Sequence, residues 1–381
     1  MTAGPGRGPL RFGIEEEFLL VDPATFRTVP LAKRVLAEAR PTLGRRAQTE
    51  FIATQVEACT RPVATVDELR SELAATRGIL AAAAASAGCL LVASGTPVLP
   101  SAHPLPVTDA PRYREVAAHV GAVADQPGGE LCGCHVHLGE LTRAEALALG
   151  VRLRPWLPVL EAMCVNSPFC EGRDRGLAST RAGCYAAWPT CGPAPVLDEP
   201  GYERTVRRLL SERVILDRKM IYWYARPSEH VPTLEIRIAD TNADREVIVL
   251  LAVLLRGLAR VPRASAPPPP VPAPAEVARA HRLAARSGLS GPGLDLRTGV
   301  LRPMRELLSD LLVHASPGLE RTGDLALAQT LVRRLLAGGT GADRQRADFA
   351  RRGSFRDVVA GLAATTARSQ SRLAPAPTAP A

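Results

Sequence analysis

The sequence predicts an α+β protein with a largely antiparallel sheet. Up to about residue 260, predicted strands are interspersed with predicted helices. The rest of the chain is predicted to be almost entirely helical. Elements arranged in this way favour an α+β fold in which helices cover one face of a sheet. With 381 residues, of which 46% are hydrophobic and 22% charged, the chain is long enough to build a substantial core.

The first part of the chain yields five predicted elements. They are a strand at 10–22, a helix at 30–40, an extended run at 50–58, a helix at 66–88 and a short buried strand at 89–93. Thr65 is predicted to cap the longer helix, because Asp67 and Glu68 fall in its first turn, and Gly88 is predicted to end it.

The second part contains further strands and a series of helices. The predicted elements are strands at 131–138 and 233–239, and helices at 142–164, 242–260, 275–287, 299–314, 324–337 and 354–367. Pro155 and Pro158 interrupt the helix at 142–164. Residues 168–201, rich in Gly, Pro, Arg and Ser, are predicted to form one long, ordered and functional loop.

The low-complexity segments mark the limits of one domain. We expect residues 1–9 to be flexible, 262–275 to be a Pro-rich connector, and 371–381 to be a disordered tail. A single domain is therefore expected over residues 10–370.

The sequence shows neither a membrane span nor a secretory signal, so a cytoplasmic protein without membrane partners is expected. The eight cysteines are then expected to be reduced thiols.

Basic residues outnumber acidic ones by nine, which suits an anionic ligand. The arginines form no dense basic arm, and aromatic residues do not alternate with them as in a nucleic-acid stacking surface. No nucleic-acid partner is expected. A small anionic substrate such as a nucleotide suits the charge equally well.

Three predicted strands carry polar residues two positions apart. These pairs are Glu15 with Glu17, His135 with His137, and Glu235 with Arg237. Side chains alternate between the two faces of a strand, so the members of each pair share a face. In the second and third strands the interleaved residues are apolar. One face of the sheet is therefore predicted to pack on helices while the other carries carboxylates, imidazoles and a guanidinium.

A sheet face with this many carboxylates is suited to divalent cations. Glu57 adds a further acidic strand position. Carboxylates packed together repel one another unless cations intervene, and Mg²⁺ prefers oxygen ligands. Such a face would bind the phosphates of ATP through the metal. The alternative for each pair taken singly is an ordinary solvated strand face.

The segment Cys132-x-Cys134-His135-x-His137 also raises the possibility of a zinc site. Because cysteines and histidines alternate between faces, they cannot all converge on one ion. Cys132 is instead predicted to pack as a small hydrophobic residue, and its replacement by serine to be nearly silent.

These residues resemble the glutamate–cysteine ligase type 2 family, the bacterial carboxylate–amine ligases. The matching segments run in order along nearly the whole chain, and together they are highly specific. They are Phe12–Pro23, Gln55–Glu57, Gly133–His137, Asn166–Phe169, Gly172–Asp174, Ala178–Arg181, Trp188–Gly192 and Thr233–Arg237.

The resemblance implies a fold similar to glutamine synthetase and the guanido kinases. In that fold a curved antiparallel sheet forms an active-site funnel with helices packed on its outer face. The implied reaction is ATP-dependent: a side-chain carboxylate, typically the γ-carboxylate of glutamate, becomes an acyl phosphate. An amine such as cysteine then attacks it to form an amide. The resemblance is also compatible with a homodimer or larger assembly.

The resemblance and the residue types together imply roles. Mg²⁺, or Mn²⁺ in its place, would be held by Glu15, Glu17, Glu57 and Glu235, with His135 touching metal or phosphate. His137 would bind substrate or polarise the transferred group, and Arg237 would stabilise the phosphoryl oxygens. Arg173 and Arg181 would clamp a carboxylate or phosphate, with a structural salt bridge as the alternative.

The sequence departs from the family pattern at several positions outside the predicted metal face. Cys170 replaces an aromatic residue, Leu177 replaces a tyrosine, and the helix at 280–286 lacks the usual Asn and Trp. A different acid and amine pair is therefore an open alternative. Two others are a phosphotransferase on the same fold and a nucleotide-binding module without turnover.

Overall fold

A computed structural model of the chain describes residues 10–261 and 271–368. The predictions for residues 1–9 and 371–381, and for most of the connector at 262–275, concern residues outside these ranges.

The centre of the molecule is a single sheet in which every neighbouring pair of strands is antiparallel. Its strands follow the order β2 (Ala47–Thr49), β3 (Gln55–Cys59), β1 (Phe12–Val21), β5 (Gly133–Gly139), β9 (Thr233–Asp240) and β8 (Ala225–Pro227). The short β4 (Leu90–Val92) pairs with the end of β1. This arrangement confirms the predicted α+β class and antiparallel sheet.

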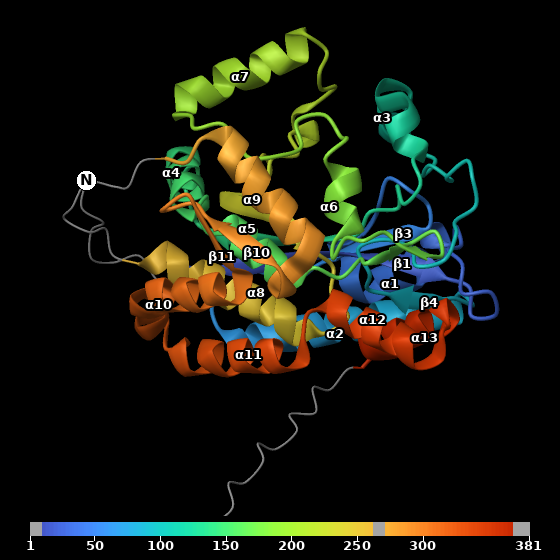
Figure 1. Cartoon of the computed structure of the whole chain (residues 1–381). Helices are drawn as coiled ribbons and strands as arrows, with labels where there is room; N and C mark the ends of the chain where they lie inside the picture. Colours follow the sequence, from blue (N-terminus) through green and yellow to red (C-terminus); the bar gives the residue numbers. More distant parts are fainter. Residues whose placement is uncertain (1–9, 262–270, 369–381) are drawn as a thin grey trace, which may run out of the picture.

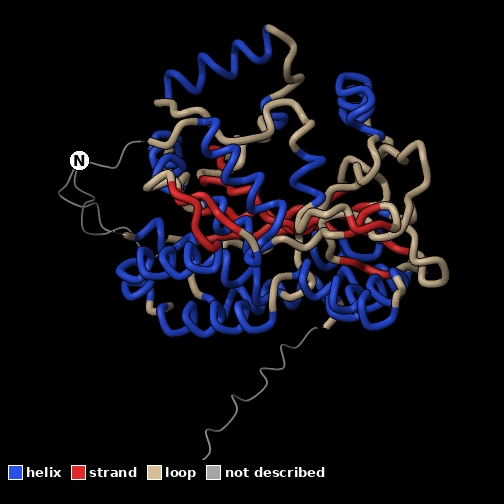
Figure 2. The backbone as a smooth tube through the Cα atoms, in the orientation of Figure 1, coloured by secondary structure: helices blue, strands red, loops and turns tan. Residues whose placement is uncertain are grey.

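Helices account for most of the remaining described chain. They are α1 (Ala32–Leu43), α2 (Val66–Ser86), α3 (Pro111–Val120), α4 (Arg143–Leu153), α5 (Leu157–Cys164), α6 (Thr180–Tyr185), α7 (Glu199–Ser211), α8 (Arg245–Arg260), α9 (Pro274–Ser287), α10 (Met304–Thr322), α11 (Leu325–Gly338), α12 (Gly341–Arg352) and α13 (Phe355–Thr366). In the view of Figures 1 and 2, α2, α8, α11, α12 and α13 lie below the sheet and α3, α6 and α7 above it.

The apolar residues of the central strands form the outer face of the sheet, as predicted. Val136 of β5 and Ile236 of β9 belong to the same buried cluster as most of α8. That helix is buried along nearly its whole length, from Glu246 to Leu258. The apolar alternation therefore decides which face of the sheet receives the helical layer, and it leaves the polar face free for other use.

Helix α2 begins where the sequence predicts. The Thr65 hydroxyl accepts a hydrogen bond from the Glu68 backbone N–H, and the Glu68 carboxylate accepts one from the Thr65 N–H. This reciprocal capping box satisfies backbone N–H groups that have no partner within the helix. Gly88, just beyond the helix, has a φ of 84°, which glycine adopts easily.

A buried ion pair ties β1 to α2. Arg77 of α2 donates through Nε and Nη2 to the two carboxylate oxygens of Glu16, at 3.0 and 2.5 Å. It also donates to the backbone carbonyls of Asn242 and Ala243, just before α8. Arg77 is only 1% exposed. The sequence analysis identified no role for Glu16; the structure shows that it lies on the outer face and anchors three segments.

Several predicted boundaries were wrong. The helix predicted at 299–314 begins only at Met304, because residues 300–303 form β11 (Val300–Pro303) in a hairpin with β10 (Pro292–Asp295). Helix α12 was missed because its charged sequence lacks an apolar stripe; its start is fixed by the Thr340 cap. Helix α7, capped by Asp198, was also missed.

The segment at 168–201 is not one uninterrupted loop. It contains the two-residue strands β6 (Phe169–Cys170) and β7 (Arg173–Asp174), the helix α6 and the first residues of α7. Four further short 3₁₀ turns lie at Gly44–Arg46, Gly121–Asp125, Arg218–Met220 and Gly288–Ser290.

Two general expectations concern the chemical environment. All eight cysteines are free thiols in the structure. Among the described residues, no helix has both the length and the apolar character needed to cross a membrane.

Candidate active site

Strand pairing brings the three sequence motifs together on one face of the sheet. Glu15 lies opposite His135 in the β1–β5 pair, and His137 lies opposite Glu235 in the β5–β9 pair. Directly opposed residues of antiparallel strands have their Cβ atoms only about 4.5–5.5 Å apart. Residues separated by more than two hundred positions in the chain therefore meet at the centre of the sheet.

Glu15 lies between the two histidines. Its Oε2 is 3.3 Å from Nδ1 of His135, and its Oε1 is 3.2 Å from Nε2 of His137. The second nitrogen of His137 is 2.9 Å from the Thr233 hydroxyl. The second nitrogen of His135 is 3.8 Å from Oε1 of Glu17. One carboxylate thus joins the imidazoles of β5 to the acidic residues of β1.

Arg237 forms the basic end of the same cluster. Its guanidinium contacts the Glu235 carboxylate, lies 3.3 Å from Nδ1 of His135, and donates to the Tyr185 hydroxyl at 3.2 Å. Arg226 holds Glu235 from the other side, with Nε and Nη2 at 2.8 and 3.2 Å from its oxygens. Two arginines therefore fix Glu235.

Arg226 and Tyr185 were not predicted. Arg226 lies directly opposite Glu235, but β8 is only three residues long and ends in a proline, too short to be recognised as a strand. Tyr185 lies in the segment at 168–201, where no strand alternation relates it to Arg237. Its contact with Arg237 depends on the position of α6 above the sheet (Figure 1).

The structure separates the two arginines predicted on that segment. Arg181 is buried, donates through Nη2 to the backbone carbonyl of Arg237 at 3.3 Å, and lies 3.9 Å from Oδ1 of Asp240. Arg173 is exposed on β7, and within the described residues no ion pair or side-chain hydrogen bond joins it to the charged cluster. Of the two, only Arg181 belongs to the site as the structure shows it.

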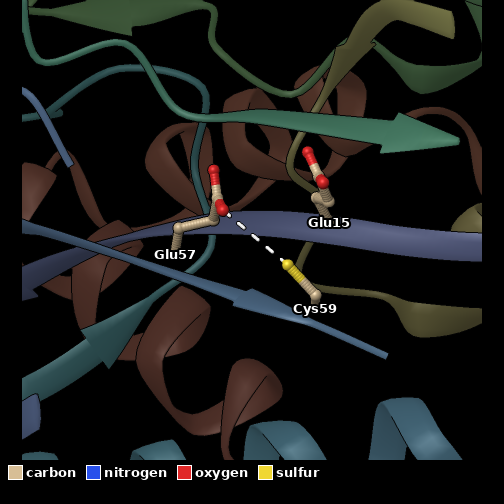
Figure 3. A group of neighbouring side chains, drawn as sticks. All are labelled: Glu15, Glu57 and Cys59. Atoms are coloured by element: carbon tan, nitrogen blue, oxygen red, sulfur yellow. Dashed lines mark hydrogen bonds between the residues drawn. The ribbon is translucent and has the colours of Figure 1, made fainter. Parts of the chain in front are cut away.

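Acidic residues extend the cluster along β1 and β3. Glu17 of β1 lies opposite Glu57 of β3. Glu50, which precedes β3 in the chain, offers a carboxylate oxygen within 4.8 Å of theirs. Figure 3 shows Glu57 and Cys59 of β3 beside Glu15 of β1. The Cys59 thiol lies 3.7 Å from the Glu57 carboxylate. Glu50 was missed because the turn at 51–54 between it and β3 cannot be read from residue alternation. Cys59 was also missed, although it lies two positions after Glu57 on β3 and alternation places both on one face.

Burial and mutual repulsion raise the pKa values of three of these carboxyl groups. Burial, and then the charge of Glu50, raises the pKa of Glu17 to about 8. Burial also raises the pKa of Glu50, and burial together with the charges of Glu15 and Glu50 raises that of Glu57 well above its ordinary value. With a pKa near 8, Glu17 is held largely in the neutral form at pH 7 in the absence of a cation.

The groups nearest the histidines and arginines behave differently. Burial acts to raise the pKa of Glu15, but its hydrogen bonds to the histidines outweigh burial and lower it. Burial also acts to raise the pKa of Glu235, but the charges of Arg237 and Arg226 outweigh burial and lower it. Burial and the neighbouring Arg237 lower the pKa of His135 to about 4, while the contact with Glu15 overcomes burial and raises that of His137.

The donor set fits a hard divalent cation. Glu17, Glu50 and Glu57 offer carboxylate oxygens that all lie within 4.8 Å of one another. Mg²⁺ and Mn²⁺ prefer oxygen ligands, and a cation here would relieve the repulsion between the three groups. The neutral thiol of Cys59, whose pKa is raised by burial and by Glu57, is a poor ligand for such an ion.

A second group of donors includes a histidine. Glu15, His137 and Glu235 offer ligand atoms within 4.8 Å of one another. The sequence placed His135 with the metal ligands and His137 with the substrate. Nδ1 of His135 lies 3.3 Å from Glu15, 3.8 Å from Glu235 and 3.3 Å from the Arg237 guanidinium. Both histidines therefore lie beside carboxylates that could hold a cation, and their predicted roles stay predictions.

Cys134 of β5 and Cys132, which lies just before that strand, are not among these donors. Cys132 and Cys134 are both fully buried and belong to two different apolar clusters. The structure thus places Cys132 among apolar residues as predicted, and gives no support to a zinc site that combines these cysteines with His135 and His137.

Comparison with known proteins finds relatives that match nearly the whole chain. Residues 11–361 match the model of the glutamate-cysteine ligase family 2. A protein of Saccharopolyspora erythraea, named as a candidate glutamate–cysteine ligase 2-1, is 43% identical over 92% of this chain and 93% of its own length. A protein of Salinispora tropica with a similar name is 41% identical over 96% of this chain and 97% of its own length.

Solved structures share the fold at low sequence identity. A glutamate–cysteine ligase of Francisella tularensis in complex with AMP matches 95% of this chain and 89% of its own, with a TM-score of 0.71 and 10% identity. A bifunctional glutathione synthetase of Pasteurella multocida matches 95% of this chain but only 53% of its own, with a TM-score of 0.68 and 15% identity. These likenesses concern the fold alone.

Proposed function

Because the chain belongs to the glutamate-cysteine ligase family 2, we propose that it couples the γ-carboxylate of glutamate to an amine such as cysteine, using ATP. It is an enzyme that forms a carbon–nitrogen bond, as the ligase names of its relatives indicate. The supporting observation is the buried cluster in which carboxylates, imidazoles and arginines from distant strands meet on one sheet face. Residues 10–370 would form the single catalytic domain.

In the first proposed step the substrate carboxylate attacks the γ-phosphorus of ATP. The bond between that phosphorus and the ADP oxygen breaks, and an acyl phosphate forms. Phosphoryl transfer depends mainly on alignment and charge neutralisation. Arg237 supplies a fixed guanidinium, since Glu235 and Tyr185 hold it in place. Arg181, buried next to the Arg237 backbone, adds positive charge beside it.

A divalent cation, Mg²⁺ or Mn²⁺, would neutralise the phosphate oxygens during this step. Two separate groups of side chains could each hold such an ion, one made of Glu17, Glu50 and Glu57 and the other of Glu15, His137 and Glu235. His135 would instead keep Glu15 and Arg237 in position.

In the second proposed step the amine nitrogen attacks the acyl carbon. The bond between that carbon and the phosphate oxygen breaks, and the leaving phosphate takes the proton that the amine gives up. His137 lies against Glu15, and the raised pKa of its imidazole favours the protonated form. When it is not engaged with a cation, an imidazolium there can polarise the reacting acyl oxygen.

The test is to measure ADP, phosphate and coupled product with ATP, Mg²⁺, glutamate and a panel of amines. Glu235→Gln should lower ADP release at least about 100-fold while the protein stays folded. Glu140→Gln is the matched control, because that side chain is 76% exposed and makes only a loose ion pair with Arg11. Normal turnover in Glu235→Gln would remove this residue from the reaction.

The same assay separates the proposal from a phosphotransferase. A ligase requires the amine and yields an amide together with ADP and phosphate. A stable phosphorylated product formed at the same rate without any amine would instead indicate phosphotransfer.

The identity of the acid and amine is the finer part of this proposal. The departures from the family pattern, Cys170 and Leu177, lie in the segment at 168–201 rather than among the charged strand residues. Cys170 is fully buried. Mass spectrometry of the products formed from the panel would identify the pair.

A further inference from the structure

A second large opening lies away from the charged cluster. It is a cleft of about 820 Å³ whose walls come from the start of α8, from α11, from the start of α12 and from the end of α13. These helices lie below the sheet in Figure 1, whereas α6 lies above it. The volume falls within the range of clefts that bind small ligands.

One side of the cleft is cationic. Arg344 donates through Nη1 to the Gly339 carbonyl at 2.8 Å, and no other hydrogen bond or ion pair of its guanidinium is found among the described residues. Arg368, at the rim, likewise has no carboxylate within ion-pair distance in the described part of the chain. Residues 242–246 and 341–345 add the positive N-terminal ends of two helices.

The floor of the cleft offers hydrogen-bond acceptors. Asn242 and Gln345 line it and are almost completely buried. Their amide nitrogens are occupied: Asn242 donates to the Cys164 carbonyl at 3.4 Å, and Gln345 donates to the Asn166 carbonyl at 2.8 Å. Their amide oxygens have no partner among the described residues. A buried acceptor without a partner costs about 1–3 kcal/mol, so a donor that enters from the cleft would be bound favourably.

We propose that this cleft binds a small zwitterion, an α-amino acid or a short peptide. Its carboxylate would lie on Arg344, and its ammonium group would donate to the amide oxygens of Asn242 and Gln345. Asp244 and Asp348 also line the cleft but are paired with Arg334 and Arg351, so the ammonium group would depend on the two amide oxygens. Inorganic phosphate keeps a hydroxyl donor at neutral pH but has no cationic group, so it would satisfy the arginine without placing an ammonium group on these oxygens.

A chain of contacts leads from this cleft to the proposed active site. Gln345 donates to Oδ1 of Asn166 at 2.9 Å, and the Asn166 backbone N–H donates to Asp240 at 2.8 Å. The other oxygen of Asp240 lies 3.9 Å from Arg181, which donates to the Arg237 carbonyl. Resting on the proposed function, the inference extends to regulation: a ligand on Gln345 would shift Arg181 and Arg237 and so change the affinity for ATP.

Binding can be tested on the full chain without ATP. L-glutamate, glycylglycine and inorganic phosphate are titrated by calorimetry into the wild type, Arg344→Gln, Glu235→Gln and the control Arg279→Gln, whose side chain is exposed on α9. At least one of the two zwitterions should bind the wild type, Glu235→Gln and the control alike, and Arg344→Gln at least 10-fold more weakly. Equal affinity of Arg344→Gln and wild type for both zwitterions would overturn the proposal. Tighter binding of phosphate than of either zwitterion would overturn it as well.

A second variant protects the test if Arg344→Gln fails to fold. Arg368→Gln changes an exposed rim residue and should weaken the same binding by a smaller factor; unchanged binding would count against the site. Loss of ADP release with intact zwitterion binding would refute only the proposed function. Intact ADP release without Arg344-dependent binding would refute only the cleft. An ATP KM that the bound zwitterion leaves unchanged would refute the coupling.

Discussion

Neighbouring glutamates of β1 lie in opposite environments. Glu16 faces the helices, where Arg77 donates to both of its oxygens. Glu15 and Glu17 face the other way, and the structure gives neither of them an arginine that binds both of its oxygens. The same residue type, one position apart, is therefore fully paired on one face and surrounded by other acids and imidazoles on the other.

Within β1, the fully paired carboxylate is the structural one, because a carboxylate held by a fixed guanidinium has few lone pairs left for a ligand. Pairing alone does not identify function across the whole sheet, since Arg226 also donates to both oxygens of Glu235 on the polar face. Glu17 and Glu57 instead carry raised pKa values, because burial is not offset by a full set of donors. A divalent cation bound on this face would supply the positive charge that these carboxylates lack.

The largest expected effect is a loss of stability when the structural carboxylate Glu16 is replaced. Glu16→Gln leaves the buried Arg77 without its counter-charge, and breaking a buried pair of this kind costs about 3–5 kcal/mol in the free energy of unfolding. Denaturant unfolding would measure this loss, and ADP release per folded molecule should be unchanged. A loss below about 1 kcal/mol would show that Glu16 is not an anchor.

The same substitution at Glu17 should reduce activity rather than stability. Glu17→Gln should lower Mg²⁺-dependent ADP release at least about 100-fold, because an amide is a poor ligand for Mg²⁺. At pH 7 without metal its free energy of unfolding should change by no more than about 1 kcal/mol, since the wild-type group is largely neutral there. A stability loss as large as that of Glu16→Gln would abolish the distinction between the two faces.

The raised pKa of Glu17 also predicts a pH dependence. The folded group titrates near pH 8 and the unfolded one near 4.5, so the folded state binds more protons between these values. Stability is therefore expected to fall as the pH rises through this window, and less so in Glu17→Gln. Because Mg²⁺ binds the ionised form, its stabilising effect on thermal unfolding should be greater at pH 8 than at pH 6. Equal Mg²⁺ effects at both pH values would contradict this assignment.

The smallest expected effect concerns a buried cysteine. Cys132→Ser keeps a similar size and retains a hydroxyl that can accept the hydrogen bond from Gln55, whose Nε2 lies 3.1 Å from the thiol sulfur. We expect a change in the free energy of unfolding within about 1 kcal/mol and no change in metal content. A large loss of bound metal, measured by atomic emission, would revive the zinc alternative.

Much of the site could be predicted because strand alternation is a local rule. Residues two apart share a face whatever the rest of the chain does, so Glu15 with Glu17 and Glu235 with Arg237 could be paired from the sequence. The start of α2 followed equally directly from the Thr65 capping box. These features depend on a few consecutive residues.

Other features depend on which strands pair and in what register, and no local pattern contains that information. Arg226 enters the site only because β8 pairs with β9, and Glu50 joins the acids only because of the turn that precedes β3. Arg181 and Arg173 looked equivalent until the position of α6 buried one of them and left the other exposed.

The sequence by itself therefore determined the fold class, the two faces of the central strands and most of the acidic and basic side chains on the polar face. Tertiary contacts were needed to show that Glu15 lies between the two histidines, which arginine is buried, and that a separate cleft opens below the sheet. The physical reason is that side-chain direction follows from backbone geometry over two or three residues. Contacts between distant strands and helices are instead selected by the packing of the whole core.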